Sequence, residues 1–297
     1  MFKLIVGAMM AAVLLSATTA SALASVVPQR LAATASADPG VILSLGDSLA
    51  VGLQPAKFGF RPTLGYAGVV AEQMSKLMPG IKLVRYGCAG ATTTSFIRGG
   101  PCPFSNPPYG RGSQLIAAER FITANRGRVK LVMIDIGAND VVHCARANFG
   151  PLKTGCLAVM LPRVRKNVAL IAQRLRQAAG PSLRLVGLNY YNPFLAAYVQ
   201  GGKGRSRAMA SVSLIRNKFN DRLVQAYRQH GFVVADVARA FGSDLPFSTM
   251  TVLSPYGRIP ASVANICKHT WACDRRSDIH ARDSGYGLMA AAVLTAT

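Results

Sequence analysis

Short apolar runs and longer amphipathic segments alternate along most of this chain. Runs of strand length lie at 40–46, 81–87, 129–137, 183–189 and 231–237. Between them, apolar residues recur at spacings of three and four and predict helices over 65–78, 113–125, 161–175 and 212–229. A last helix is expected from Asp283 onwards. Strands that alternate with helices predict an α/β fold, in which helices cover both faces of a parallel sheet.

The first residues form a different pattern. Lys3 precedes an apolar run over 4–15, and Ala22-Leu23-Ala24 follows it. This order is typical of a secretory signal peptide over 1–24, cleaved before Ser25. The alternative is a membrane anchor, but the run is shorter than the roughly 18–20 residues that a spanning helix needs. We therefore expect a secreted, extracellular or cell-envelope protein, with an irregular lead-in over 25–39 and one domain over 40–297.

Composition narrows the class of protein. Hydrophobic residues make up 51% of the chain, which excludes a disordered protein. The formal net charge of +22 favours electrostatic contact with anionic surfaces. The cations are mostly scattered, and the one local cluster, at 201–207, accompanies no nucleic-acid motif. We expect a monomer with a solvated basic surface and no specific nucleic-acid binding.

The chain has six cysteines, which should be paired in an exported protein. Short loops close at low entropic cost, so we expect pairing between neighbours in the sequence. The expected pairs are Cys88 with Cys102, Cys144 with Cys156, and Cys267 with Cys273. The alternative is a zinc site, with ligands from Cys267, His269, Cys273 and His280. Export and the lack of a C-x-x-C spacing argue against it, and we expect no metal.

Polar, glycine-rich stretches follow the first three predicted strands. They lie at 46–48, 87–93 and 137–140, and a further polar stretch at 277–287 precedes the last helix. The carboxyl ends of parallel strands meet at one edge of a sheet, where α/β proteins form their sites. We therefore expect these stretches to lie together. Taken alone, Ser48 could also be a helix cap and Asn139 a turn residue.

These stretches resemble the motifs of the SGNH or GDSL family of serine esterases and lipases. The matching residues are Gly46-Asp47-Ser48-Leu49, Gly90, Gly137-Ala138-Asn139-Asp140, Asp278 and His280. The resemblance implies a single-domain, three-layer flavodoxin-like sandwich with a central five-stranded parallel sheet. It also implies that Ser48 is the nucleophile and His280 the base. The oxyanion hole would consist of the Ser48 and Gly90 backbone N–H groups and the Asn139 amide, with no cofactor.

The sequence departs from the family pattern at several positions. The family acid often stands three residues before the histidine, but position 277 is serine, so Asp278 is the candidate acid. A Ser-His dyad oriented by backbone carbonyls is the alternative. Ala281 stands where the family often has proline, and the second block lacks the usual asparagine. Glycine suits position 90 because a Cβ would crowd an acyl carbonyl approaching the backbone.

The resemblance implies hydrolysis of a carboxylic ester through an acyl-enzyme. The expected disulfides resemble those of secreted lipase-like members and favour acyl-lipid substrates. The alternatives are a carbohydrate O-acyl esterase and a non-catalytic envelope-binding module on the same fold. Aromatic residues that could line an acyl pocket, or pack in the core or loops, are Tyr86, Phe96, Phe104, Tyr109, Tyr190, Tyr191 and Phe194.

Overall fold

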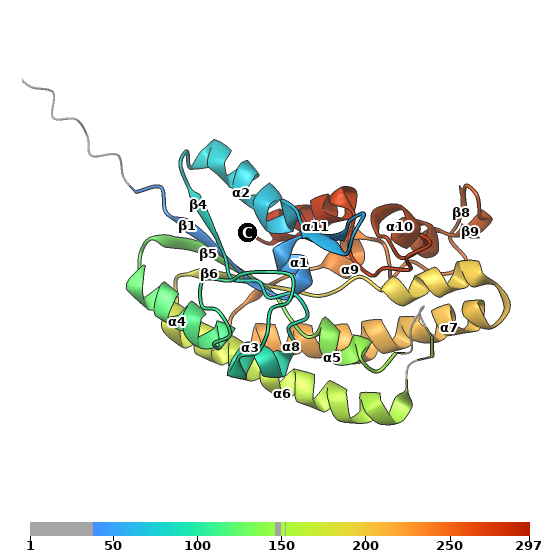
Figure 1. Ribbon diagram of the computed structural model, residues 1–297, viewed down its shortest axis with the longest axis horizontal. Helices are drawn as coiled ribbons and strands as arrows, with labels where there is room; N and C mark the ends of the chain where they lie inside the picture. The colour runs from blue at the N-terminus through green and yellow to red at the C-terminus, as the bar shows by residue number, and fades with distance from the viewer. Residues whose placement is uncertain (1–37, 146–149, 152) are drawn as a thin grey trace, which may run out of the picture. The chain divides into compact units, whose positions relative to one another are not determined.

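The structure is a computed structural model that describes residues 38–145, 150–151 and 153–297 (Figure 1). The predicted signal peptide over 1–24 and most of the lead-in lie outside the described residues. Residues 38–297 form one compact unit. A search of the described helices for a membrane span finds none of sufficient length and apolar character.

A parallel sheet forms the centre of this unit, and it has five strands among the described residues. Its order is β4 (Lys82–Arg85), β1 (Val41–Gly46), β5 (Val129–Asp135), β6 (Arg184–Leu188) and β7 (Val233–Ala235). Every residue of β1 is buried, because both faces of the sheet are covered. The α/β, flavodoxin-like prediction is confirmed. The last strand is shorter than the predicted run over 231–237.

Helices cover the two faces of the sheet (Figure 1). On one face, α2 (Gly65–Leu77) packs against α11 (Asp283–Ala296). On the other, α6 (Thr154–Ala179) lies between α4 (Gln114–Ala124) and α8 (Asp221–Gln229). The apolar residues that predicted α6, from Leu161 to Leu175, are buried, and Gly180 ends the helix as expected.

Short elements between these helices and strands were not predicted, because they span too few residues to show a period. The helical ones are α1 (Ser48–Val51), α3 (Thr93–Arg98), α5 (Ala138–Val142), the 3₁₀ helix η1 (Pro193–Gln200), α9 (Val237–Ala240) and α10 (Ala261–His269). The antiparallel hairpins are β2 (Leu53–Pro55) with β3 (Phe60–Pro62), and β8 (Met250–Leu253) with β9 (Gly257–Pro260). The helix predicted over 212–229 begins earlier, as α7 (Gly202–Ser213), and passes through the π-helical η2 (Leu214–Asn220) into α8.

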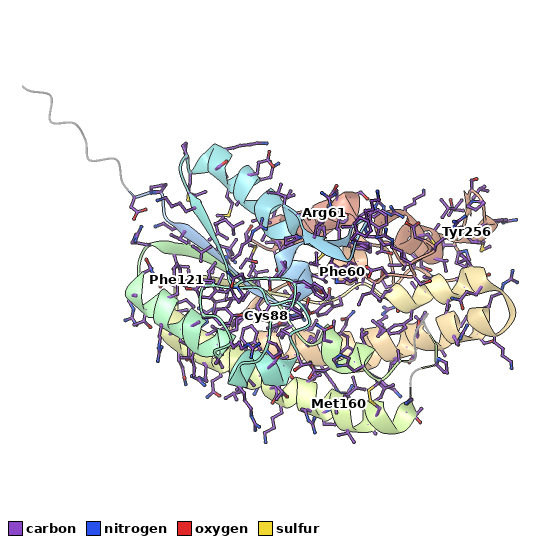
Figure 2. The ribbon with its side chains drawn as sticks, viewed as in Figure 1. Phe60, Arg61, Cys88, Phe121, Met160 and Tyr256 are labelled. Atoms are coloured by element: carbon purple, nitrogen blue, oxygen red, sulfur yellow. A yellow bond between two sulfur atoms is a disulfide. The ribbon has the colours of Figure 1, made fainter. Side chains whose placement is uncertain are left out.

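Disulfides join cysteines that are neighbours in the sequence, and Cys88 is labelled in Figure 2. The bonds are Cys88–Cys102, Cys144–Cys156 and Cys267–Cys273, with Cα–Cα distances of 5.1, 5.6 and 5.0 Å. The first fastens the loop after β4, the second ties the end of α5 to α6, and the third closes the loop after α10. Because Cys267 and Cys273 are bonded to each other, they are not available as the thiolate ligands of the zinc alternative.

Candidate active site

The turn that carries Ser48 begins where β1 ends. Gly46 has a φ of +138°, and a Cβ at this position would lie 2.1 Å from the backbone oxygen of Asp135. Only glycine avoids this clash and tolerates the positive φ. Gln114 holds the turn from α4, because its side chain accepts from the Gly46 N–H at 2.6 Å and donates to the Gly46 carbonyl at 3.1 Å. Ser48 is therefore fixed at the first position of α1.

Asp47 caps this short helix. Its Oδ1 accepts a hydrogen bond from the Leu49 N–H at 3.0 Å, and its Oδ2 accepts one from the Tyr190 hydroxyl at 3.0 Å. An aspartate at the N-cap satisfies one of the N–H groups that the first helical turn leaves without a partner. Asp47 thus orients the turn next to the serine, and it contacts residues that follow a different strand.

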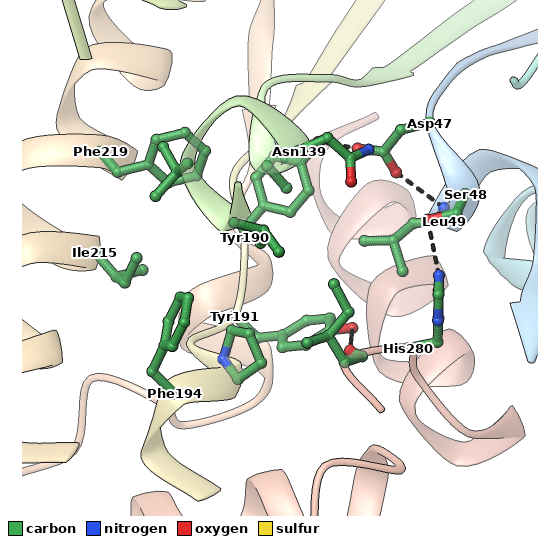
Figure 3. A pocket seen from close by; sticks show the side chains of 15 residues that line it. Asp47, Ser48, Leu49, Asn139, Tyr190, Tyr191, Phe194, Ile215, Phe219 and His280 are labelled. Carbon is green, nitrogen blue, oxygen red and sulfur yellow. Dashed lines mark hydrogen bonds between the residues drawn. The ribbon is translucent and has the colours of Figure 1, made fainter. Parts of the chain in front are cut away.

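Ser48, His280 and Asp278 form a hydrogen-bonded chain at the sheet edge, and Figure 3 shows its first link, from Ser48 to His280. Ser48 Oγ lies 2.9 Å from His280 Nε2, and His280 Nδ1 lies 2.7 Å from Asp278 Oδ1. A proton on Nδ1 lets the ring donate to the carboxylate and leaves Nε2 free to accept from the serine hydroxyl. The side chains of His280 and Asp278 are only 11% and 13% exposed. This arrangement can remove the proton of a serine hydroxyl as it attacks.

The local backbone explains why a spacing of two residues suffices for the acid and the histidine. Asp278 Oδ1 accepts from the backbone N–H of His280 at 2.9 Å as well as from the ring. Ser277 has a φ of +47°, so the chain turns sharply just before Asp278. The loop is held by the Tyr191 hydroxyl, which donates to the Ile279 carbonyl at 2.6 Å. The carboxylate thereby lies beside the ring although only one residue, Ile279, separates Asp278 from His280.

Asn139 and Gly90 come from the other two strand ends. Asn139 lines the same pocket as Ser48 and His280, and its Nδ2 donates one hydrogen bond to the Ala91 carbonyl at 2.9 Å. An amide nitrogen has two hydrogens, so one remains for a ligand. Asp140 also joins α5 to the stretch after β4. Its carboxylate accepts from the backbone N–H and from the hydroxyl of Thr93, at 2.8 Å each.

Gly90 occupies a turn in which the Ala91 N–H donates to the Cys88 carbonyl at 3.0 Å. Its φ is +80°, and a Cβ built there meets no atom within 4 Å. The backbone conformation, and not crowding within the protein, therefore requires glycine. Gly90 is exposed and is not among the residues that line the pocket. Asn139 donates to the carbonyl of Ala91, the residue after Gly90. This hydrogen bond brings the two predicted oxyanion-hole stretches together.

The pocket beside Ser48 has a volume of about 510 Å³, including its open mouth. Its walls are mostly apolar (Figure 3). The residues that the sequence patterns did not single out for this role are Leu49, Ala138, Val141, Val142, Pro193, Ile215, Phe219 and Ile279. Of the candidate aromatic residues, Tyr190, Tyr191 and Phe194 line it, whereas Phe96 lies in the core and Tyr86 packs against Tyr109. An acyl chain suits such walls, because apolar surface gains free energy when it leaves water.

Beneath Ser48 lies a pair of buried carboxyl groups that sequence reasoning missed. Asp135, the last residue of β5, accepts from the Asp47 N–H at 3.1 Å and from the Tyr66 hydroxyl at 2.6 Å. Its side chain also hydrogen-bonds the Asp47 side chain. Burial, together with the charge of Asp47, raises the pKa of Asp135 well above its ordinary value. Burial also raises the pKa of Asp47, but hydrogen bonds from Leu49, Asp135 and Tyr190 oppose that shift. Asp135 is therefore the member that holds the proton.

We expect Asp135→Asn to stabilise the protein increasingly as pH rises. The unfolded chain loses the Asp135 proton above about pH 4, whereas the folded protein keeps it until its raised pKa is reached. The wild type therefore loses stability across this range, and the neutral amide does not. Thermal unfolding of both proteins between about pH 4 and pH 8 measures the difference. If the difference in Tm between the variant and the wild type stays constant across these pH values, the pKa of Asp135 is not raised.

Comparisons with known proteins agree with this geometry. A profile of the GDSL-like lipase/acylhydrolase family matches residues 44–287. Among solved structures, the chain is similar to a lipase from a goat rumen metagenome, with 17% identity, a TM-score of 0.53, and coverage of 86% of this chain and 97% of that one. It is also similar to an extracellular lipase from Streptomyces rimosus, with 18% identity and a TM-score of 0.49. This likeness covers 87% of this chain and 100% of the lipase. The first of these likenesses shows a shared fold. A search of curated protein sequences found no relative.

Proposed function

The chain belongs to the GDSL-like lipase/acylhydrolase family and is a carboxylic ester hydrolase, and on that premise we propose that it is an exported enzyme that cleaves acyl-lipid esters through an acyl-enzyme on Ser48. The observation that carries this proposal is the hydrogen-bonded chain from Ser48 through His280 to Asp278, which opens on an apolar pocket. The predicted signal peptide and the disulfides support export.

In the first half of the reaction, Ser48 Oγ attacks the ester carbonyl while His280 Nε2 accepts the hydroxyl proton. Asp278 holds the ring by its Nδ1–H and balances the positive charge that the ring acquires. The tetrahedral intermediate collapses when the C–O bond to the alcohol breaks and His280 returns the proton to the leaving oxygen. In the second half, a water molecule attacks the acyl-enzyme, again with His280 as the base, and releases the carboxylic acid.

The oxyanion hole of this proposal consists of the Ser48 and Gly90 backbone N–H groups and the side-chain amide of Asn139. Donors that are held in place before the reaction stabilise the charge that develops on the carbonyl oxygen. The hydrogen bond from Asn139 to Ala91 supports this role, because it fixes the amide plane and leaves the second N–H for the substrate. The positive φ of Gly90 fits a backbone turned to offer its N–H at the sheet edge.

We expect Asn139→Ala to lower kcat by about 10²–10³-fold and to leave KM nearly unchanged. The amide acts on the charge of the transition state, which the ground-state ester lacks. Asn139→Asp is the matched variant, because it keeps the size of the side chain and removes the N–H donors. Steady-state kinetics on a p-nitrophenyl ester measure both, with circular dichroism as the check on folding. An effect confined to KM would be inconsistent with this role.

The substrate class is tested with p-nitrophenyl esters of increasing acyl length, from acetate to palmitate. An apolar pocket next to Ser48 should raise kcat/KM as methylene groups are added, by about a few-fold per buried group, until the pocket is filled. Fastest hydrolysis of the acetate would instead favour the carbohydrate O-acyl esterase. No hydrolysis of any ester would favour the non-catalytic envelope-binding module. Export is tested separately, by N-terminal sequencing of protein from the culture medium, which should begin at Ser25.

A further inference from the structure

The hairpin formed by β2 and β3 is firmly anchored at its base and exposed at its tip. The Tyr286 hydroxyl donates to the Leu53 carbonyl at 2.7 Å, and the Trp271 indole N–H donates to the Gln54 side chain at 3.2 Å. At the tip, the Ala56 N–H donates to the Gly59 carbonyl at 2.9 Å and closes the turn. Phe58 lies in this turn and is 85% exposed. A rigid support therefore presents a large aromatic side chain to solvent.

The same hairpin forms part of the surroundings of the catalytic histidine. The Phe60 ring meets the His280 ring edge-on, with centroids 5.5 Å apart, and it contacts the half-exposed Phe104, with centroids 5.3 Å apart. Arg276, from the loop that leads to Asp278, donates to the Ala56 carbonyl. The hairpin thus contacts His280 and the loop that carries Asp278.

Cations lie on the hairpin and beside it. The Lys57 Nζ lies 5.5 Å from the centroid of the Phe58 ring, and Arg61 and Arg276 are exposed on the same structure (Figure 2 labels Phe60 and Arg61). The nearby carboxylates have partners, because Asp283 accepts from Gln54 and Asp278 accepts from His280. We call this surface the hairpin rim and define it as Lys57, Phe58, Arg61, Phe104 and Arg276. Its charge is complementary to an anionic partner.

We propose that the hairpin rim docks the enzyme on an anionic lipid surface, with the Phe58 ring among the acyl chains and the cations at the headgroups. An aromatic side chain gains free energy on leaving water for the edge of the hydrocarbon, and long basic side chains reach back to the phosphates. Each cation near such a surface strengthens binding by about fivefold. Docking through this rim brings the lipid close to the side of the site at which Phe60 contacts His280. This docking serves the proposed hydrolysis of acyl lipids, and in that respect it rests on the proposed function. The binding itself is measured independently of hydrolysis.

The test is partition of the purified protein onto vesicles of phosphatidylcholine with and without phosphatidylglycerol. We expect binding to the anionic vesicles, with Phe58→Ala lowering the partition constant by about tenfold and Lys57→Gln by about fivefold. Phe58→Trp should restore or strengthen binding. Leu77→Ala is the matched control, because Leu77 is also 85% exposed but lies at the far end of α2, about 18 Å along the helix from Gly65. It should bind like the wild type.

Three outcomes would overturn the docking proposal. They are equal binding to both kinds of vesicle, wild-type binding by Phe58→Ala, and equal weakening by Leu77→Ala. Retention on an acidic polysaccharide without binding to vesicles would overturn it as well. Hydrolysis of soluble p-nitrophenyl acetate should be unchanged in the Phe58, Lys57 and Leu77 variants. If the wild type binds vesicles but hydrolyses no ester, the proposed function fails and the docking surface remains.

Discussion

Replacing Ser48 with alanine should lower kcat for a p-nitrophenyl ester by about 10⁵–10⁶-fold. The acyl-enzyme cannot form without the hydroxyl that lies 2.9 Å from His280 Nε2. What remains is hydrolysis by water in a site that still binds the ester. The same substitution should abolish covalent labelling by a fluorophosphonate, which reacts with an activated serine. Label incorporation is measured by mass spectrometry of the intact protein.

Ser75→Ala is a suitable control for the Ser48 variant. Ser75 is half-buried on α2, where its hydroxyl donates to the Glu72 carbonyl, and it is not among the residues that line the pocket beside Ser48. This variant should label and turn over like the wild type. Labelling of Ser48→Ala at the wild-type rate would identify a different serine as the nucleophile.

Asp278→Asn should lower kcat by about 10³–10⁴-fold with little change in KM. The Asp278 Oδ1 holds both the backbone N–H and the ring of His280, so an asparagine oxygen can keep this geometry. The negative charge is lost, and with it the stabilisation of the imidazolium that forms in the transition state. The kinetics of this variant therefore measure the effect of the negative charge while the position of the His280 ring is kept.

Asp274→Asn is the matched control for Asp278→Asn. Asp274 lies in the same loop and accepts from Arg282 at 2.9 Å, but it does not contact His280. We expect its kcat to stay within about twofold of the wild type, since loss of a half-exposed ion pair changes little. If Asp278→Asn also keeps most of its activity, the Ser-His dyad replaces the triad.

The fold and the positions of the motif residues could be predicted because both leave local signals in the sequence. The run over 40–46 is apolar at both faces of its strand, which is the pattern of a buried parallel strand. The strand order then brings Ser48 and Asn139 to one edge, and the loop before the last helix brings His280 to the same edge. The catalytic roles of these residues remain predictions until the variants are measured.

The rest of the site could not be predicted, because its signals depend on the packing of distant elements. Ile215 and Phe219 appear in the sequence as the apolar face of a helix, and nothing local distinguishes a core face from a pocket wall. Asp135 is the one polar residue of the apolar stretch 131–137, and its partners Asp47 and Tyr66 lie 88 and 69 residues away. The strands of the β2–β3 hairpin have three residues each, too few for an alternating pattern.

The distances along the chain between Ser48, Asp278 and His280 also affect when a newly made chain can become active. Asp278 and His280 are two residues apart and can meet as soon as their loop is synthesised, whereas Ser48 and His280 are 232 residues apart. Contacts of such long separation form late, because closing the intervening chain costs entropy before the contact repays it. A ribosome-bound chain that stops short of position 280 carries a serine without its base. With the proposed roles of Ser48 and His280, esterase activity therefore reports synthesis and folding of nearly the whole chain, and truncated products that lack His280 should be inactive.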